Sequence, residues 1–207
     1  MGASRVVLIR HAESQWNAAR RWQGQGGPGL SDLGHRQAAV TARFLAGHEP
    51  AVRRIVSSDL PRVVETAMPA ARALGIEPEL DARLREIDVG WWSGLTTPEV
   101  LERDPNGVKA MRAGHDPARG GAETMADVRG RVVHAVAELA DACEGGTLLV
   151  FSHGGPVRSI VGDVLGLSVA QQVTLAGPGN ASRTVLTNGG GGRQLRSYNE
   201  TTHLADV

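Results

Sequence analysis

Two short apolar runs, far apart in the chain, constrain the fold more than any other feature. Val6-Val7-Leu8-Ile9 leads into Arg10-His11-Ala12-Glu13-Ser14, and Leu148-Leu149-Val150-Phe151 leads into Ser152-His153-Gly154-Gly155. Short runs of branched apolar residues that end in polar clusters are typical of strands buried on both faces of a parallel sheet. In open α/β sheets, ligands bind beyond the carboxyl ends of such strands. The pattern therefore predicts a site at which His11 and His153 come together.

Helical patterns alternate with the candidate strands over most of the chain. The alternation predicts an α/β fold, a three-layer sandwich whose central sheet is mostly parallel, has about six strands and is covered by helices on both faces. Asn188 and the four glycines after it suit a hairpin turn, so we expect one antiparallel edge strand. The candidate strands are residues 5–10, 53–57, 77–81, 147–152, 183–187 and 194–198.

Helix boundaries can also be predicted from the sequence. Ser58 is expected to cap a helix that has Pro61 in its first turn and Gly75 after its last. Thr124 and Asp127 form the Thr-x-x-Asp capping pattern at the start of a later helix. We expect one domain, residues 1–207, that contains a polar segment rich in glycine and proline at residues 96–121. This segment is interpreted as a partly helical lid or specificity region.

Composition excludes several classes of function. The 22 basic and 22 acidic residues give a formal net charge of zero, which argues against nucleic-acid and membrane-surface partners. Cys143 is the single cysteine, so neither an intrachain disulfide nor a multi-cysteine zinc site can form. No stretch reaches the roughly 18 apolar residues that span a bilayer, and no signal-peptide pattern is present. We expect a soluble cytoplasmic protein, and a homodimer is one assembly that the sequence leaves open.

Four side chains near strand ends carry the candidate chemistry, and each has an ordinary structural alternative. A lone histidine such as His11 or His153 is more often a hydrogen-bonded core residue, but an arginine precedes the first and two glycines follow the second. Arg62, near the start of a helix, would by default be solvated, as would Glu86 in its loop. Glycines and helix N-termini favour anions. Together these positions indicate a phosphate site.

The same segments resemble the histidine phosphatase superfamily, also called the phosphoglycerate-mutase-like family. Arg10-His11-Ala12-Glu13-Ser14 is similar to its Arg-His-Gly-Glu-Thr signature. Five blocks in the correct order carry the resemblance, and they extend over nearly the whole chain. They are residues 10–17, residues 23–24 together with 30–38, residues 57–66, residues 86–94 and residues 152–155.

The resemblance implies a role for each matching residue. His11 would attack phosphorus and form a phosphohistidine, and Glu86 would protonate the leaving oxygen. Phosphoryl transfer depends mainly on positioning and on charge stabilisation, for which arginines are suited. The resemblance implies a metal-independent phosphatase that needs no organic cofactor. Its substrate would be a small phosphorylated metabolite, hydrolysed at a phosphomonoester bond. The phosphate-binding residues would be Arg10, Asn17, Gln23, Gly24, Arg62, His153 and Gly154, of which Arg10, Arg62 and His153 also count as catalytic.

Alternatives remain open at this stage. A phosphoglycerate mutase would pass the phosphoryl group to a second hydroxyl, although mutases of the family carry a longer insertion between the acid and the His-Gly-Gly segment. Ala12 replaces the family's usual glycine, which keeps an inactive phospholigand-binding module as a candidate. A metal-dependent hydrolase is a third alternative. Substrate specificity is predicted to involve residues 96–121 together with Trp16, Trp22, Gln23, Trp91 and Trp92. Trp91 and Trp92 are also predicted to shield a neighbouring carboxylate from water.

Overall fold

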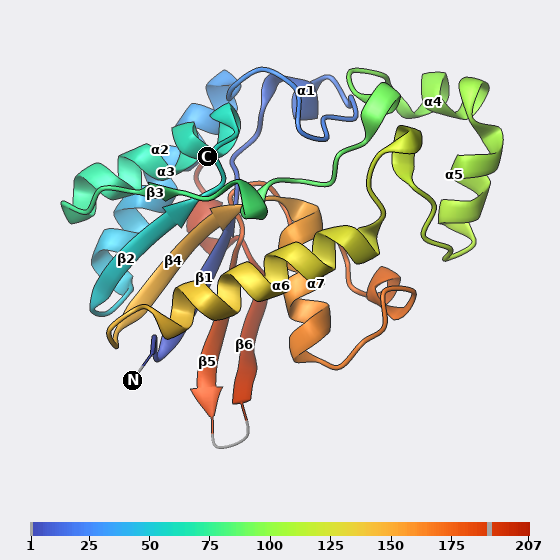
Figure 1. The fold of residues 1–207 in the computed structure, drawn as a ribbon. Helices are drawn as coiled ribbons and strands as arrows, with labels where there is room; N and C mark the ends of the chain where they lie inside the picture. The colour runs from blue at the N-terminus through green and yellow to red at the C-terminus, as the bar shows by residue number, and fades with distance from the viewer. Residues whose placement is uncertain (1, 190–191) are drawn as a thin grey trace.

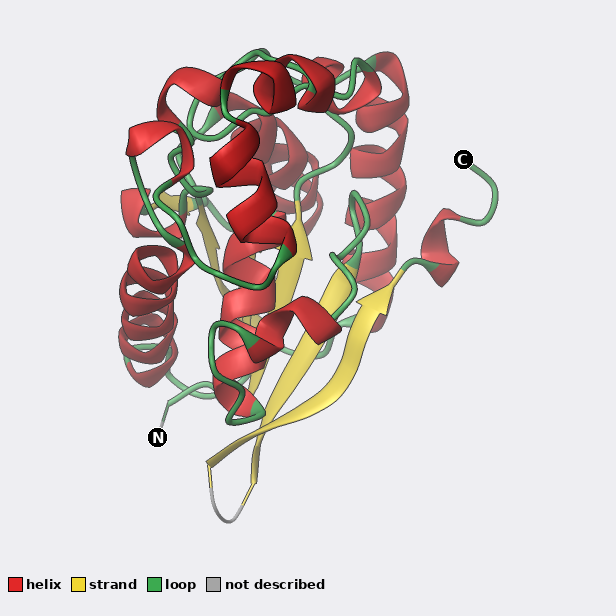
Figure 2. Cartoon of the chain, turned by 90° about the vertical axis from the view of Figure 1, so that its right-hand side faces the viewer, coloured by secondary structure: helices red, strands yellow, loops and turns green. Residues whose placement is uncertain are grey.

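A three-layer α/β sandwich is seen in the computed structural model, which describes residues 2–189 and 192–207 (Figure 1). Six strands form one sheet in the order β3-β2-β4-β1-β5-β6, which confirms the predicted fold class. The turned view of Figure 2 shows the strands between helices on both sides. The strands are β1 (Arg5–Arg10), β2 (Val52–Ser57), β3 (Glu79–Leu80), β4 (Thr147–Ser152), β5 (Arg183–Gly189) and β6 (Gly192–Glu200).

Strand direction follows the prediction with one refinement. The pairs β1·β4, β2·β4 and β2·β3 are parallel, whereas β5 pairs antiparallel with both β1 and β6. The strand that runs against the others is therefore β5, which lies one place inside the edge, and β6 forms the edge itself. Of the turn predicted at residues 188–192, residues 190 and 191 lie outside the described part of the chain.

The central strands are buried on both faces because the two faces pack against different helices. Val6 and Leu8 of β1 join the apolar cluster under α6 (Met125–Asp141) and α7 (Gly154–Val164). The alternate residues Val7 and Ile9 join the cluster under α2 (Asp32–His48) and α3 (Pro61–Leu74). Each fully buried aliphatic side chain contributes roughly 1.5–3 kcal/mol to folding, so this two-sided burial holds β1 and β4 firmly.

Three short helices lie beyond the carboxyl ends of the strands, at the top of Figure 1. They are α1 (Gln15–Ala18), α4 (Thr97–Arg103) and α5 (Pro105–Arg112), and the last two belong to the 96–121 segment. Among the described residues, no helix is long and apolar enough to cross a membrane.

Two local predictions need correction. The strand predicted at residues 77–81 is reduced to Glu79–Leu80, because Pro78 has no N–H to donate to a ladder. Ser58 does not cap α3. Its N–H still pairs with Phe151 of β4, so the helix begins later, with Leu60 as the N-cap. By contrast, the capping box of Thr124 at the start of α6 is present as predicted.

Candidate active site

A cavity of about 270 Å³ opens at the carboxyl end of the sheet. Seven of the nine residues predicted for the site line this cavity, whereas His153 and Gly154 do not. They come from the ends of β1, β2 and β3 and from the loops that follow, which lie together at this edge. The predicted residues in the lining are Arg10, His11, Asn17, Gln23, Gly24, Arg62 and Glu86.

His11 is held in one tautomer. Its Nδ1 lies 2.7 Å from the carbonyl oxygen of Ala12, which can only accept, so Nδ1 carries the hydrogen and Nε2 keeps its lone pair. Burial, followed by the charges of Arg10 and Arg62, holds the pKa of His11 well below its usual value. The ring is therefore neutral at neutral pH. A neutral imidazole with a free lone pair is a competent nucleophile.

Two guanidinium groups flank this ring and are oriented by carbonyl oxygens. Arg62 donates from Nη1 to Gly26 at 2.8 Å and from Nη2 to Gly24 at 2.7 Å, and Arg10 donates from Nη1 to Pro178 at 2.6 Å. Burial lowers the pKa of Arg62 to about 10, which leaves it charged. Because carbonyls orient arginines without neutralising them, the cavity keeps its positive charge for an anion.

Gly24 is required at its position by geometry. Its φ of +54° lies in the left-handed region, and a Cβ there would come within 2.7 Å of Val89 Cγ2. Only glycine brings its carbonyl to Arg62 without strain. Gly24 therefore acts through the guanidinium that it orients.

Asn17 and Gln23 present amide donors to the cavity. Asn17 Oδ1 accepts from the Ser14 backbone N–H and from Asn180 Nδ2, both at 3.1 Å. Gln23 Oε1 accepts from the Ser14 hydroxyl at 2.7 Å. With each amide oxygen occupied, the –NH₂ groups are the ends available to a ligand, and this orientation follows from the hydrogen-bond network.

Glu86 is the one carboxylate in the cavity lining. Its Oε1 accepts from the Ile87 N–H at 3.0 Å, and its Oε2 accepts from the Gly155 N–H at 3.2 Å. The second bond ties the acid to the first turn of α7. Glu86 is thus held in place across the cavity from β1 by two backbone groups.

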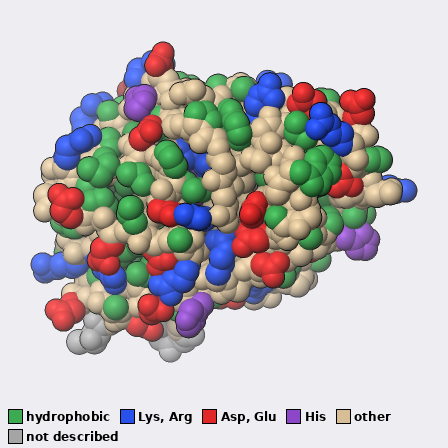
Figure 3. All heavy atoms as spheres, turned by 45° about the horizontal axis from the view of Figure 1, so that its top comes forward, with side chains coloured by type: hydrophobic (Ala, Val, Ile, Leu, Met, Phe, Trp, Pro, Cys, Tyr) green, Lys and Arg blue, Asp and Glu red, His purple; other side chains and the backbone are tan. Residues whose placement is uncertain are grey.

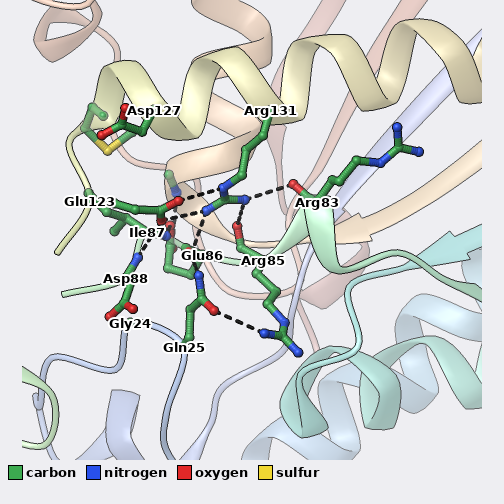
Figure 4. A network of polar contacts seen from close by, with 12 residues as sticks. Gly24, Gln25, Arg83, Arg85, Glu86, Ile87, Asp88, Glu123, Asp127 and Arg131 are labelled. Carbon is green, nitrogen blue, oxygen red and sulfur yellow. Dashed lines mark hydrogen bonds and ion pairs between the residues drawn. The ribbon is translucent and has the colours of Figure 1, made fainter. Parts of the chain in front are cut away.

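Arg131 of α6 fixes the segment that carries Glu86 (Figure 4). Its guanidinium donates to the carbonyl oxygens of Arg83 at 2.8 Å, Arg85 at 2.6 Å and Glu86 at 2.9 Å. The remaining bonds go to Glu123, which forms an ion pair with Arg131 at 2.9 Å and accepts from the Asp88 N–H at 2.8 Å. Arg131 therefore holds three points of the loop, and Glu123 holds a fourth. Sequence analysis missed Arg131, because nothing in its spacing separates it from other helix arginines.

Comparison with known proteins decides the family. The model of the histidine phosphatase superfamily (branch 1) matches residues 6–201. The chain belongs to this superfamily. Glucosyl-3-phosphoglycerate phosphatase of Mycolicibacterium vanbaalenii is 36% identical, over 88% of this chain and 83% of its own. Phosphoserine phosphatase 1 of Hydrogenobacter thermophilus is 33% identical, over 98% and 95%. A solved mycobacterial glucosyl-3-phosphoglycerate phosphatase complexed with VO3 has a TM-score of 0.87 and 34% identity, over 96% of this chain and 100% of that chain.

In this member of the superfamily, His153 lies behind the cavity lining. Its Nδ1 accepts from Arg62 Nη2 at 3.1 Å, and its Nε2 donates to the Ser58 hydroxyl at 2.9 Å. Burial and the charge of Arg62 hold the pKa of His153 well below its usual value. The ring centroids of His153 and His11 are 5.2 Å apart. His153 therefore holds Arg62 from the side that faces away from the cavity. The Ser58 hydroxyl accepts the bond from His153 and does not cap α3.

Gly154 also lies just outside the lining. A Cβ on Gly154 would meet Arg10 Nε at 3.6 Å, so this residue packs beneath the arginine. Gly155, not Gly154, reaches the cavity and donates to Glu86. Of the two glycines predicted at this helix start, the second is therefore the one in the lining.

Of the four tryptophans predicted to contribute to specificity, Trp22 is the one in the described residues that lines the cavity. Trp22 lines the cavity, whereas Trp92 is completely buried in the core and packs edge-on against Trp22 at 5.3 Å. Trp91 is 48% exposed, and Trp16 packs over Gly27. Trp91 and Trp92 therefore shield no carboxylate in the cavity, because their side chains point into solvent and into the core.

Several lining residues were not singled out from the sequence. Arg158 lies three residues after Gly155 on α7, the helical spacing that puts two residues on one face, and this spacing was a usable signal. Arg119 comes from the 96–121 segment, whose pattern gave no residue-level signal. Among residues 2–189 and 192–207, no group of three or more His, Cys, Asp or Glu is placed to hold a metal ion. The other lining residues are Arg20, Arg21, Trp22, Ile87, Val89, Thr97 and Met125.

Proposed function

We propose that the protein is a phosphatase that hydrolyses small phosphomonoesters through a phosphohistidine on His11. The observation that carries the proposal is a neutral imidazole, with its Nε2 lone pair free, in one cavity with two guanidinium groups and the side chain of Glu86. The names of the relatives, which are phosphatases of small phosphorylated acids, support the same activity. Such compounds belong to the cytoplasm, so the proposal places the enzyme there.

The first step transfers the phosphoryl group to the protein. The Nε2 lone pair of His11 attacks phosphorus, the bond between phosphorus and the ester oxygen breaks, and Glu86 gives its proton to the departing alkoxide. Arg10 and Arg62 stabilise the charge on the non-bridging oxygens, and the amides of Asn17 and Gln23 orient them. The products are the free alcohol and a phosphohistidine.

The second step returns the enzyme to its starting state. The Glu86 carboxylate accepts a proton from water as the water oxygen attacks phosphorus. The bond between phosphorus and Nε2 breaks, and its electron pair returns to His11. Inorganic phosphate leaves, and Glu86 is protonated again for the next cycle. No step requires a metal ion or an organic cofactor.

Ala12 does not obstruct this chemistry. It is absent from the non-glycine residues with positive φ, so the family's glycine is not needed for backbone strain. Its buried methyl group packs with Leu30, Ala38 and Ala181, outside the cavity lining, and its N–H donates to Thr66. The geometry thus removes the physical reason for an inactive binding module.

The decisive experiment measures hydrolysis and traps the intermediate. We expect the protein to release phosphate from 4-nitrophenyl phosphate, with the rate unaffected by a chelator. His11→Ala should lower kcat at least a thousandfold while the fold is retained. Rapid quenching with a radiolabelled phosphomonoester should give label on His11 that acid removes and base does not.

Three outcomes contradict the proposal, and each favours one alternative. Interconversion of 3- and 2-phosphoglycerate without phosphate release would indicate a mutase. Inactivation by a chelator would indicate a metal-dependent hydrolase. Absence of any turnover, with His11→Ala still binding phosphate like the wild type, would indicate a binding module.

A further inference from the structure

The cavity holds more positive charge than one phosphate group needs. Six arginines line it beside the single carboxylate of Glu86. Elsewhere the charges are mixed: basic and acidic side chains are interspersed over the face that Figure 3 turns to the viewer. In the proposed mechanism only Arg10 and Arg62 serve the transferred phosphoryl group. The arginines without a role in that mechanism are Arg20, Arg21, Arg119 and Arg158.

Arg119 is buried without an acidic partner. It is 9% exposed, its Nη1 contacts the sulfur of Met125 at 3.1 Å, and its buried Nε has no partner among residues 2–189 and 192–207. The nearby acids are engaged elsewhere. Asp116 accepts from the N–H groups of Met125 and Ala126, and Glu123 is paired with Arg131. Burying an unpaired guanidinium costs free energy that a bound anion would offset.

The backbone keeps Arg119 in this position. Gly120 has a φ of +53°, and a Cβ there would lie 1.9 Å from the carbonyl oxygen of Val89. A Cβ on Gly90 would lie 2.1 Å from the carbonyl oxygen of Gly120, so the two glycines pack backbone to backbone. The N–H of Arg119 also donates to Glu123 at 3.0 Å. Arg119 is therefore anchored at the cavity wall rather than at a free loop tip.

Arg158 faces Arg119 at the junction of two cavities. A second cavity of about 450 Å³ adjoins the first, and both are lined by Trp22, Arg119, Met125 and Arg158. No hydrogen bond or ion pair joins the Arg158 side chain to the rest of the described chain. The pKa of Arg119 is lowered by burial and, in part, by the charge of Arg158. The charge of Glu86 acts on Arg119 across the first cavity, but neither arginine forms an ion pair with an acid in the described part of the chain. Two positive charges on the walls that both cavities share therefore form a site for an anion.

We propose that Arg119 and Arg158 bind a second anionic group of the substrate, a carboxylate or a second phosphate carried by the leaving alcohol. The uncharged remainder of the alcohol extends into the second cavity, where Met111, Val169 and Val173 supply apolar surface. Paired guanidinium groups suit this role because they form bidentate bonds with carboxylates and phosphates. The inference rests on the proposed function, since it names the class of substrate for the same cavity.

Matched substrates test the inference. The acid 3-phosphoglycerate is compared with glycerol 3-phosphate, which lacks its carboxylate, and fructose 1,6-bisphosphate with fructose 6-phosphate. In at least one of the two pairs, we expect the wild type to prefer the substrate that carries two anionic groups by about tenfold or more in kcat/KM. The pair that shows the preference identifies the second group as carboxylate or phosphate. Arg119→Gln and Arg158→Gln should each remove most of this preference by raising the KM of the substrate that carries the second anionic group. Arg119→Lys, which keeps the charge, should retain part of the preference.

Arg103→Gln is the control, because Arg103 belongs to α4 of the same segment but lines neither cavity. It should leave the preference unchanged. Equal kcat/KM within both pairs, or equal losses on both partners in the two glutamine variants, would overturn the inference while leaving the phosphatase proposal intact. If the wild type hydrolyses nothing, the proposed function fails. Calorimetry with 3-phosphoglycerate and glycerol 3-phosphate then still decides whether the second anionic group is bound.

Discussion

At the scale of single residues, His11 as nucleophile and Glu86 as proton donor are held by different kinds of neighbour. His11 is prepared as a nucleophile by one hydrogen bond to its own neighbour, and by burial and two positive charges that lower its pKa and keep it neutral. Glu86 touches no cation directly, and both of its oxygens accept backbone N–H groups. Its contribution is therefore a proton for the leaving oxygen, and the value of that proton depends on the leaving group.

We expect Glu86→Gln to discriminate between substrates by their leaving group. Glutamine keeps the size of the side chain but cannot donate an acidic proton. A nitrophenolate leaves without protonation, whereas the alkoxide of glycerol 3-phosphate does not. General acid catalysis contributes about 10²–10⁴-fold, so the loss in kcat/KM, which reports the first step and not the hydrolysis of the phosphohistidine, should approach this range for glycerol 3-phosphate and be much smaller for 4-nitrophenyl phosphate. Equal losses on both substrates would show that Glu86 does not act as the acid.

At the scale of elements, α6 positions the acid although it contributes no predicted catalytic residue. Arg131 donates to three carbonyl oxygens within residues 83–86 of the loop, and Glu123, just before the helix, completes the network (Figure 4). The capping box of Thr124 fixes the residue at which α6 starts, and hence the position of Arg131 relative to the loop. Loop geometry in this protein is thus set by a helix on one face of the sheet.

The same network gives a prediction for Arg131→Lys. Lysine keeps the charge but cannot supply the fork of donors, so the loop should lose its fixed geometry while KM changes little. We expect kcat/KM on glycerol 3-phosphate to fall at least tenfold, and by clearly less on 4-nitrophenyl phosphate, as for Glu86→Gln.

Arg129→Gln is the matched control for this effect. Arg129 lies on the same helix and is also bonded to a carbonyl and to an acid, Leu167 and Asp163, but it is outside the cavity. It should lower the free energy of unfolding without changing the ratio of the two rates. A ratio that changes equally in both variants would assign Arg131 a structural role only.

Elements with a strong local pattern were predictable from the sequence, and the details of the site were not. The apolar runs of β1 and β4 and the capping pattern of Thr124 depend on neighbouring residues alone, and the structure contains them as predicted. Ser58 was misassigned because its N–H is taken by Phe151, a partner far away in the sequence. Arg131 was missed for the same reason, since the three carbonyl oxygens that it binds come from a distant segment. Arg119 was missed because its position depends on the backbone packing of Gly120 against Val89 and Gly90, which its own neighbours do not reveal.

At the scale of the whole molecule, the site affects stability. His11 and His153 are both buried in the cationic region, and His203 is half-buried against α2, with a lowered pKa that is caused mainly by burial. The folded pKa of each lies below its value in the unfolded chain, so the unfolded chain takes up these protons at a higher pH than the folded chain does. Folding therefore releases protons from these histidines at pH values near and below 6.5. The active site makes the protein more sensitive to mild acid than its zero net charge suggests.

The free energy of unfolding should decrease as the pH falls below about 6.5, the histidine pKa in the unfolded chain. Each histidine whose folded pKa is depressed contributes a slope of about 1.4 kcal/mol per pH unit, because below pH 6.5 the unfolded chain holds the extra proton. Urea unfolding at several values between pH 7.5 and 5.5 measures this slope. His11→Gln should reduce it by about one proton. His134→Gln should not, since the side chain of His134 is 77% exposed. An equal slope in the wild type and in His11→Gln would mean that His11 is protonated in the folded state, and the nucleophile proposed above would then lack its lone pair.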